Sequence, residues 1–288
     1  MVDYGIPENS DPRVDLHVHS TCSDGLADPA AGVEAAKECG LAAMALTDHD
    51  TLAGIEEAAA RAVELELPFV PGLEFSAYDD AGSTHILAYY VDPEDRELVE
   101  HLSSALESRE RRAAKMVEAL NRLGMDVTMD EVRTHASEGG LIARPHVARA
   151  LLDGGWVRSY NEAFSRFLAA GQPAYVPTRR IAPPAAIELI HGAGGLAVLA
   201  HGGRTHSEAA IRGLVDAGLD GLEVLHPDHG PYEVQRLRKL ADELGLLETG
   251  GSDWHGPHDS RRGQLASMPV PYEWYERLRE AASARHAR

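Results

Sequence analysis

Seven short apolar segments, each bounded by turn-forming residues, follow one another along the chain. Their length and composition are typical of buried β-strands. They cover residues 13–19, 41–47, 68–75, 84–91, 196–201, 221–226 and 246–252. Segments with helical character lie between them, at residues 29–39, 52–66, 184–191, 207–217 and 231–244. This alternation predicts an α/β fold in which helical crossovers connect the strands of a parallel sheet.

The interval between the fourth and fifth strands is too long for a single crossover helix. It contains a long amphipathic segment at residues 97–123 and two shorter helical segments at residues 146–152 and 159–169. The predicted division is therefore an α/β domain of residues 1–99 and 183–288 and an inserted helical domain of residues 100–182.

The composition is that of a globular protein with a strongly acidic surface. The 288 residues are 44% hydrophobic and 25% charged, and the net charge is −19. Such a charge repels a phosphate backbone, so we expect no binding of long nucleic acid, although a local basic pocket could hold a small anion. No apolar run reaches the ~20 residues of a membrane span, so we expect no membrane association.

The chain has two cysteines, Cys22 and Cys39, which form no CxxC pair and are too few for a disulfide framework. Their scarcity favours a reducing compartment and argues against a thiolate metal site. Residues 1–12 lack the basic and apolar regions of a signal peptide and look like a polar lead-in. We therefore expect a cytoplasmic protein.

Nearly every predicted strand carries His, Asp or Glu at or just past its C-terminal end. These residues are His17, His19, Asp48, His49, Glu74, His85, His201, Glu223, His226, Asp253 and His255. In parallel α/β folds the functional site lies at the C-terminal ends of the strands. We therefore expect these side chains to converge on one rim.

The first of these strands illustrates the chemistry. His17 and His19 lie on one face of the strand, ~7 Å apart along it, so both could reach one metal ion. Alone, such a pair is more often structural, as is a single strand histidine such as His85. Asp24 could join the pair or cap the helix that follows it. Glu74 ends an apolar strand, where a buried carboxylate needs a cation, and its two oxygens could bridge two ions.

The possible ligands combine imidazoles and carboxylates without thiolates, a mixture that suits Mn²⁺, Fe²⁺ or Zn²⁺. Asp48, beside His49, could orient a ligand rather than bind an ion. The candidate metal ligands are His17, His19, Asp24, His49, Glu74, His85, His201, Asp253 and His255. They exceed the need of one ion, so we expect two or three divalent ions.

Five motifs together resemble the PHP (polymerase and histidinol phosphatase) superfamily. They are Asp15-Leu16-His17-Val18-His19-Ser20, Thr47-Asp48-His49-Asp50, Gly72-Leu73-Glu74, Ala200-His201-Gly202-Gly203-Arg204 and Gly251-Ser252-Asp253-Trp254-His255. The resemblance implies a distorted seven-stranded (β/α)₇ barrel with a centre of three metal ions, manganese being the first candidate. It assigns one ion to His17, His19, Glu74 and Asp253, a second to Asp24, His49 and His255, and a third to Glu74, His85 and His201. Gly202 replaces the usual proline of the family, which leaves the ligand His201 in place.

The helical insertion is similar to that of one branch of the superfamily. Its members are 3′,5′-nucleoside bisphosphate phosphatases, and some trim the 5′ ends of short RNAs. Arg144-Pro145-His146 is similar to the insertion motif of this branch, and Arg109 and Arg112 match basic positions used there for phosphate. Arg109 and Arg112 could equally be solvated surface residues. The resemblance implies that the insertion covers the active site and binds a nucleotide through Arg109, Arg112, Arg144 and His146, with His229 near the leaving group.

The implied reaction is hydrolysis of the 3′-phosphate of a 3′,5′-bisphosphonucleoside to a 5′-nucleotide and phosphate. The ions would activate a water for in-line attack on phosphorus. Asp24, Arg204 and His229 are the candidate catalytic residues, of which Arg204 would neutralise developing charge. His229, or a water on the ions, would protonate the departing oxygen, and His226 could replace His229.

Three other functions fit the same residues. A histidinol-phosphate phosphatase needs only one phosphate site and leaves the insertion and its arginines without a role. A 5′→3′ exonuclease on short oligonucleotides is compatible with the acidic surface. A non-catalytic scaffold that binds metal or nucleotide is disfavoured because all nine ligand positions are filled.

Overall fold

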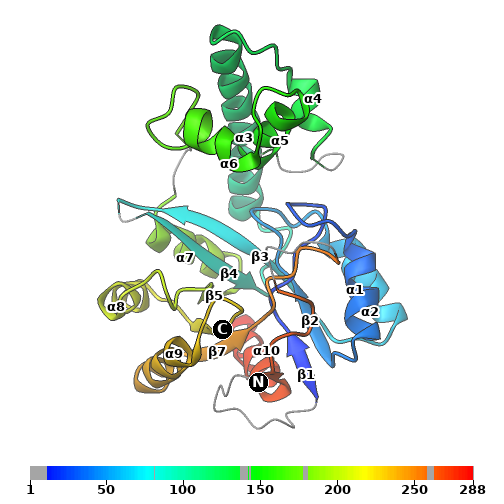
Figure 1. The fold of residues 1–288 in the computed structure, drawn as a ribbon. Coiled ribbons are helices and arrows are strands. Elements are labelled where there is room, and N and C mark those ends of the chain that lie inside the picture. The colour runs from blue at the N-terminus through cyan, green and yellow to red at the C-terminus, as the bar shows by residue number, and fades with distance from the viewer. Residues whose placement is uncertain are drawn as a thin grey trace. The chain divides into compact units, whose positions relative to one another are not determined.

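The computed structural model describes residues 12–80, 82–136, 142, 144–177, 181–257 and 263–287. The chain divides into two compact units, one formed by Met1–Val99 and Arg180–Arg288 and the other by Glu100–Arg179 (Figure 1). The lead-in expected at residues 1–12 lies outside the described residues except for its last residue.

The first unit contains one sheet of eight strands. The strands are β1 (Arg13–Asp15), β2 (Ala43–Leu46), β3 (Phe69–Tyr78), β4 (Ser83–Tyr89), β5 (Leu196–Leu199), β6 (Gly221–Leu225), β7 (Leu247–Gly250) and β8 (Val270–Pro271). Their spatial order is β7-β6-β5-β4-β3-β2-β1-β8. Each of the seven segments predicted as strands overlaps one of β1 to β7, although β3 runs on to Tyr78 and β4 begins at Ser83. β8 was not expected, because two residues are too few to show an alternating pattern.

The sheet is mixed, which corrects the expectation of a parallel sheet. β4 runs antiparallel to both β3 and β5, while β1 with β2, β2 with β3, β5 with β6 and β6 with β7 are parallel. The cause is the short connection between β3 and β4, where the backbone groups of Asp79 and Gly82 bond each other at 3.0 and 3.3 Å. A connection this short can only form a hairpin, whereas a parallel pair needs a crossover of a dozen residues or more. Figure 1 shows β3 and β4 as a long antiparallel pair.

The sheet nearly closes into a barrel. The Leu16 N–H, just past β1, donates to the carbonyl of Gly250 at the end of β7 at 3.1 Å. Val18 and Trp254 form a parallel bridge one step further along. The segments after β1 and β7 therefore lie side by side, although these strands are far apart in the sequence.

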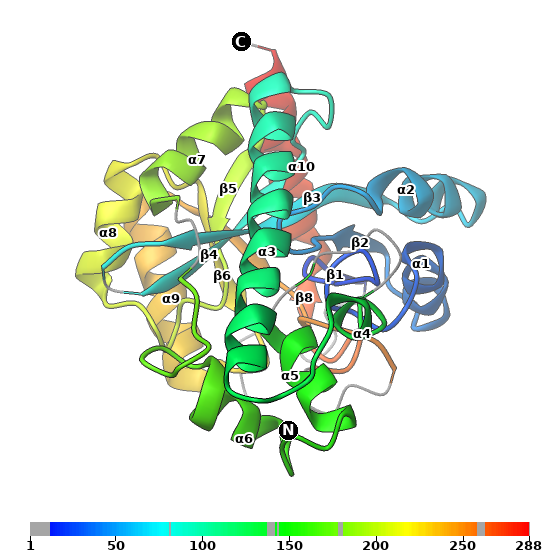
Figure 2. The ribbon, with the colours of Figure 1, turned by 90° about the horizontal axis from the view of Figure 1, so that it is seen from above.

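Helices connect and cover the strands of this unit. They are α1 (Pro29–Glu38), α2 (Ile55–Glu64), α7 (Pro183–Gly192), α8 (Glu208–Asp216), α9 (Pro231–Leu244) and α10 (Tyr272–His286). All except α10 match segments expected to be helical, and among these α7 alone extends its segment, by one residue at each end. Proline occupies the first turn of α1, α7 and α9, where its missing N–H is harmless. Figure 2 shows α1 and α2 lying side by side, and their apolar faces bury Val33 and Ala58 in one cluster with Met44 of β2.

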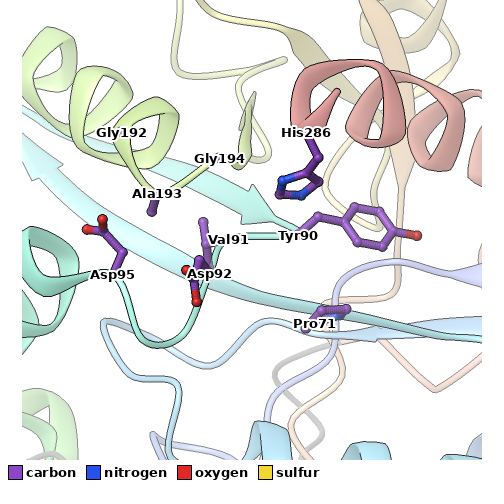
Figure 3. A pocket seen from close by; sticks show the side chains of 9 residues that line it. All are labelled: Pro71, Tyr90, Val91, Asp92, Asp95, Gly192, Ala193, Gly194 and His286. Atoms are coloured by element: carbon purple, nitrogen blue, oxygen red, sulfur yellow. The ribbon is translucent and has the colours of Figure 1, made fainter. Parts of the chain in front are cut away.

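A cavity of about 560 Å³ lies at the end of the barrel where β4 finishes and β5 begins (Figure 3). Tyr90, Asp92, Asp95 and His286 are among its lining residues. Asp92 accepts the Glu94 N–H at 2.9 Å, in the turn before the next helix, and Asp95 accepts the Leu98 N–H at 2.8 Å, in the first turn of that helix. These carboxylates therefore organise the chain at this end of the barrel.

The second unit is helical in its described residues. It contains most of α3 (Arg96–Arg122), which begins in the first unit, and then α4 (Met129–Arg133), α5 (Arg144–Asp153), α6 (Tyr160–Ala163) and a π-helical turn η1 (Phe164–Leu168). Its own core includes Met116 and Leu120 of α3 and Val147 and Leu151 of α5, all fully buried. Within the described part of the chain, none of the helices combines the length and the apolar character needed to cross a membrane.

Candidate metal centre

The predicted ligands lie along one rim of the barrel because backbone pairing continues past the strand ends. The His19 N–H donates to the Trp254 carbonyl at 2.9 Å, which places the segment of Asp253 and His255 beside the His17-His19 pair. His49 forms a parallel bridge with Glu74.

The antiparallel direction of β4 brings His85 to the same rim. His85 is near the start of β4 and pairs with Ser76 of β3. The Ala200 N–H donates to the carbonyl of His85 at 3.0 Å, which places His201 next to it. A parallel fourth strand would have carried His85 to the other end of the barrel.

Four buried donor atoms form the centre of the rim. His17 Nε2, His19 Nε2, Glu74 Oε2 and Asp253 Oδ1 lie close enough together to share one ion. His17 Nε2 lies 3.1 Å from His19 Nε2, and both nitrogens lie 3.3 Å from Glu74 Oε2. Asp253 Oδ1 lies 3.2 Å from His19 Nε2 and 3.5 Å from His17 Nε2. Four tetrahedral ligands ~2.0 Å from an ion lie ~3.3 Å from one another, so these separations fit a bound metal.

A second group of donors lies on the side of Asp24. His19, Asp24, His49 and His255 could hold an ion together. Asp24 Oδ1 lies 3.2 Å from His255 Nε2, 3.9 Å from His19 Nδ1 and 4.0 Å from His49 Nε2. Asp24 is 36% exposed, so this side of the rim is open to solvent.

The third group shares the other oxygen of Glu74. Glu74 Oε1 lies 2.7 Å from His85 Nδ1 and 2.9 Å from His201 Nε2. Glu74 Oε2 faces the central group, so the two oxygens of this carboxylate point to different donor sets. His49 Nδ1 also lies 3.2 Å from Oε2. All nine predicted ligands are therefore brought together, with Glu74 between the sets.

Several polar atoms of the rim have no hydrogen-bond partner. Within the described residues, His19 Nδ1, His49 Nδ1, His226 Nε2 and His255 Nε2 are buried without one. Buried polar atoms are nearly always paired, so each exception needs an explanation. The backbone is also strained here, because His201 and Asp253 have φ angles of 32° and 52°. The donor types, their separations and the orphaned nitrogens of His19, His49 and His255 all fit divalent ions.

The charges of the rim are strongly coupled. Burial would raise the pKa of Glu74, but the neighbouring His49, His85 and His17 hold it well below the usual range. Burial opposes protonation of His19, yet its contacts with Asp253 and Glu74 raise the pKa of His19 to about 10. Burial lowers the pKa of His49 to about 4, although Glu74 and Asp24 oppose this. The carboxylates are thus ionised near neutral pH, the form that metal binding requires.

Two further buried carboxylates support the ligands. Asp48 accepts the Ser20 N–H at 2.7 Å and the hydroxyls of Ser20 and Ser23 at 2.5 and 2.6 Å, which fixes the loop that carries Asp24. Asp15 accepts the N–H of Ser252 at 2.9 Å and that of Ala266 at 3.1 Å. Asp48 therefore orients a ligand loop, one of the two roles open to it, and Asp15 holds the segment before Asp253.

The two histidines after β6, His226 and His229, differ in how many of their ring nitrogens are held by backbone hydrogen bonds. His229 Nδ1 donates to the Val224 carbonyl at 2.9 Å, and its Nε2 accepts the Gly203 N–H at 3.0 Å. Both nitrogens of this neutral ring are engaged by backbone, which argues against His229 as the proton donor. His226 Nδ1 accepts the Asp228 N–H at 3.1 Å, so its Nε2 carries the hydrogen and lies 3.4 Å from Asp253 Oδ2.

Arg204 is exposed and follows Gly203 in the loop after His201. Arg236 of α9 donates to the carbonyls of Gly203 at 2.7 Å and His206 at 3.3 Å. Together with the bond from Gly203 to His229, these contacts hold the loop from both sides. His229 therefore acts here as a support for the segment that carries Arg204.

The predicted phosphate-binding residues belong to the second unit. Arg112 Nε donates to the Val176 carbonyl at 2.6 Å, and the Arg144 guanidinium lies 5.8 Å from the centre of the Tyr175 ring and 5.9 Å from that of Phe164. The segment of Tyr175 and Val176 thus gathers Arg112 of α3 and Arg144 of α5. Arg109 is half-buried on α3, and His146 is buried in α5. Arg179 and Arg180, which could have served similarly, lie outside the described residues.

Comparisons with known proteins agree with the chemistry of the rim. A family model described as the PHP domain matches residues 15–176. The chain is 35% identical over 264 residues to a 3′,5′-nucleoside bisphosphate phosphatase from Chromobacterium violaceum, covering 89% of this chain and 93% of that protein. It is 34% identical over 250 residues to a 5′-3′ exoribonuclease from Haemophilus influenzae, covering 85% and 90%. A solved structure from Bifidobacterium adolescentis, of a protein assigned as a metal-dependent phosphoesterase, matches with a TM-score of 0.83 and 34% identity, covering 92% and 94%. The chain belongs to the PHP family and is a metal-dependent phosphoesterase.

Proposed function

We propose that this protein removes the 3′-phosphate of a 3′,5′-bisphosphonucleoside, such as 3′-phosphoadenosine 5′-phosphate, to give a 5′-nucleotide and phosphate. The observation that carries the proposal is the rim itself, where Glu74 lies between donor sets contributed by both halves of the barrel. The similarity to a nucleoside bisphosphate phosphatase over most of both chains supports the substrate class.

Two or three divalent ions would bind the three donor sets, with Mn²⁺ as the first candidate. When bound, such ions supply an activated water and positive charge for the phosphate. His17, His19, Glu74 and Asp253 would hold one ion, Asp24, His49 and His255 a second, and Glu74, His85 and His201 a third. Asp24 is partly exposed, so the donor set to which it belongs is open to an incoming substrate.

Arg204 would neutralise charge on the phosphate, since it is exposed on a loop anchored by Arg236 and His229. For the departing oxygen, His226 is the better candidate of the two histidines left open by the sequence. Its Nε2–H points to the rim, whereas both nitrogens of His229 are engaged.

The second phosphate of the substrate would bind to Arg109, Arg112, Arg144 and His146 of residues 100–182. We propose that this insertion closes over the metal centre when the nucleotide is bound. Arg144 is suited to a phosphate because a guanidinium can donate two parallel hydrogen bonds to it. The packing of Arg144 against Tyr175 and Phe164 restricts its side chain in advance.

The reaction can be tested with purified protein, Mn²⁺ and 3′-phosphoadenosine 5′-phosphate. We expect phosphate and the 5′-nucleotide as products, separated by chromatography, and no turnover by Asp253→Asn. Equal activity of the wild type and Asp253→Asn would refute the site. Release of the 5′-phosphate instead of the 3′-phosphate, or a preference for histidinol phosphate, would refute the substrate.

The role of Arg144 has its own test. Arg144→Ala should raise KM about tenfold or more with little change in kcat if the side chain grips the remote phosphate. Arg149→Ala is the matched control, because Arg149 is an exposed arginine on the same helix. A loss confined to kcat would place Arg144 at the reacting phosphate.

A second function is a 5′→3′ exonuclease on short oligonucleotides, favoured by the similarity to an exoribonuclease over 90% of that protein. Both activities use the same metal centre and differ in whether the bound phosphate carries a following nucleotide. A 5′-labelled RNA of a few nucleotides, assayed beside the bisphosphonucleoside, separates them. A higher kcat/KM for the RNA would make the exonuclease the main activity.

A further inference from the structure

Glu223 of β6 is a buried carboxylate at the rim that the nine predicted ligands do not include. Its side chain is wholly buried, and its two oxygens have separate partners. Oε1 lies 2.8 Å from His17 Nδ1, and Oε2 accepts the backbone N–H of His201 at 2.6 Å. One carboxylate therefore contacts two candidate ligands that belong to different donor sets.

The contact with His17 determines which ring nitrogen is available to a metal. One hydrogen lies between Nδ1 and Oε1, and it resides on the imidazole because a carboxylic acid is the stronger acid. Nε2 of the same ring then keeps its lone pair, and it is Nε2 that faces His19 and Glu74 at 3.1 and 3.3 Å. A carboxylate behind a ligating histidine fixes the ring orientation and increases the basicity of the ligand.

The contact with His201 acts on the backbone. His201 has a φ of 32°, a conformation that a residue with a side chain rarely adopts. A hydrogen bond from its N–H to a buried carboxylate stabilises this conformation. In it, His201 Nε2 lies 2.9 Å from Glu74 Oε1. The Glu223 carboxylate thus supports two donor sets. One is the set of His17, which faces Oε2 of Glu74, and the other is the set of His201, which faces Oε1.

We propose that Glu223 is a positioning residue that couples the two donor sets bridged by Glu74, by orienting the His17 ring and by holding the His201 backbone. The inference rests on the metal centre of the proposed function but not on its substrate. Both hydrogen bonds need an acceptor, so an amide cannot replace the carboxylate. In Glu223→Gln, one oxygen can accept one bond, and the amide NH₂ group then faces a second donor.

The test compares Glu223→Gln with Asp220→Asn by equilibrium dialysis of Mn²⁺. Asp220 is the matched control, since its carboxylate also accepts from an imidazole, His191 Nε2 at 2.8 Å, and from a backbone N–H, that of Ala197 at 2.8 Å, but away from the rim. We expect about 10- to 100-fold weaker metal binding in Glu223→Gln, the usual effect of losing such a partner, and wild-type affinity in Asp220→Asn. The loss should affect more than one ion per chain.

The absorption spectrum of bound Co²⁺ gives a second readout that does not depend on turnover. We expect Glu223→Gln to alter the bands of the bound ions and Asp220→Asn to leave them unchanged. Glu223→Asp keeps two acceptor oxygens and should recover part of the affinity. Wild-type affinity and spectrum in Glu223→Gln, or equal losses in Glu223→Gln and Asp220→Asn, would overturn the proposal.

If Glu223→Gln fails to fold, the wild-type protein can still be used to test the orientation of the His17 ring. In ¹⁵N-histidine-labelled, Zn²⁺-loaded protein, the His17 signal, assigned by its loss in His17→Gln, should show a hydrogen on Nδ1. A hydrogen on Nε2 would overturn the proposal. Failure of the bisphosphonucleoside assay with normal metal binding would reject the proposed substrate and leave the role of Glu223 intact.

Discussion

The two ends of the barrel use histidines and carboxylates in opposite ways. Away from the rim, His191 bonds Asp220, and the same carboxylate pairs with Arg285 and accepts the Ala197 N–H. The positive charge that balances Asp220 therefore comes from a protein side chain, Arg285. At the rim, Glu74 faces the rings of His17, His19, His49, His85 and His201, and within the described residues it forms no ion pair with a lysine or arginine.

The difference shows what distinguishes a structural group from a metal site. Residue types are nearly the same at both ends, but among the described residues of the rim one ring nitrogen each of the candidate ligands His19, His49 and His255 is buried without a hydrogen-bond partner. An ion supplies a partner for those nitrogens and the positive charge that Arg285 supplies at the other end. Changes at the rim should therefore affect metal binding and activity, whereas changes at the other end should affect stability alone.

The largest effect is expected from Glu74→Gln. The substitution removes the negative charge between the donor sets and leaves one oxygen able to bind an ion. We expect kcat to fall by about 10³-fold, the upper range for the loss of a single electrostatic group at a reacting centre. The measurement is phosphate release at saturating Mn²⁺, and activity within tenfold of the wild type would contradict the bridging role.

Metal removal should lower the stability of the wild type more than any single change at the other end. An ion present at 100 times its Kd stabilises the folded state by about 2.7 kcal/mol, provided that the unfolded chain does not bind it. We expect a chelator to lower Tm, and Mn²⁺ to restore it. Asp220→Asn should start from a lower Tm and show the same shift. A shift that vanished in Asp220→Asn would mean that the two ends are not independent.

The pH dependence of stability in the metal-free protein should further distinguish the rim from the other end of the barrel. Contacts with carboxylates raise the pKa of His19 to about 10, above the 6.5 of an unperturbed histidine. The stability that this protonated ring contributes is complete below pH 6.5 and is lost as pH rises toward 10. Metal binding has the opposite sign, because the ion must displace the proton.

We therefore expect basic pH to destabilise the metal-free protein and to tighten Mn²⁺ binding, by up to about tenfold per pH unit for each proton displaced. Thermal unfolding with and without chelator across pH 6.5–9 measures the first effect, and dialysis measures the second. His19→Gln should weaken the pH dependence of stability and that of Mn²⁺ binding. Mn²⁺ affinity that stayed constant over this range would contradict the protonated state of the metal-free site.

Much of the rim could be predicted because its ligands are local to strand ends. An apolar run followed by His or Asp specifies both the strand and the end at which the side chain lies, so His49 and His201 were identified without long-range information. The direction of β4 was not predicted, because an apolar pattern reports burial and not direction. The turn at Asp79 and Gly82 was the available signal.

Roles that depend on partners far apart in the chain could not be predicted from the sequence. His229 was expected to serve the leaving group, yet its ring is engaged by Val224 and Gly203, which no pattern indicated. Glu223 was identified as a strand-end carboxylate, but its contact with His17 joins residues 206 positions apart. α10 was not expected, although its buried positions Trp274, Leu278 and Ala282 have helical spacing. For His229 and Glu223 the residue type and the local element were predicted, but the neighbouring residues were not.

The smallest expected effect is that of Asp220→Asn, and it is the most informative about the comparison of the two ends. The asparagine keeps one acceptor oxygen for three donors, and Arg285 loses its charged partner. A buried donor left unpaired destabilises by about 1–3 kcal/mol, and we expect the lower part of this range because His191 and Asp220 are partly exposed. Chemical denaturation of the metal-loaded protein measures the change, and kcat, KM and Mn²⁺ affinity should remain those of the wild type. A fall in metal affinity would show that the position of α10 and the start of β6, which carries Glu223, are mechanically linked to the rim, and that the two ends form one system.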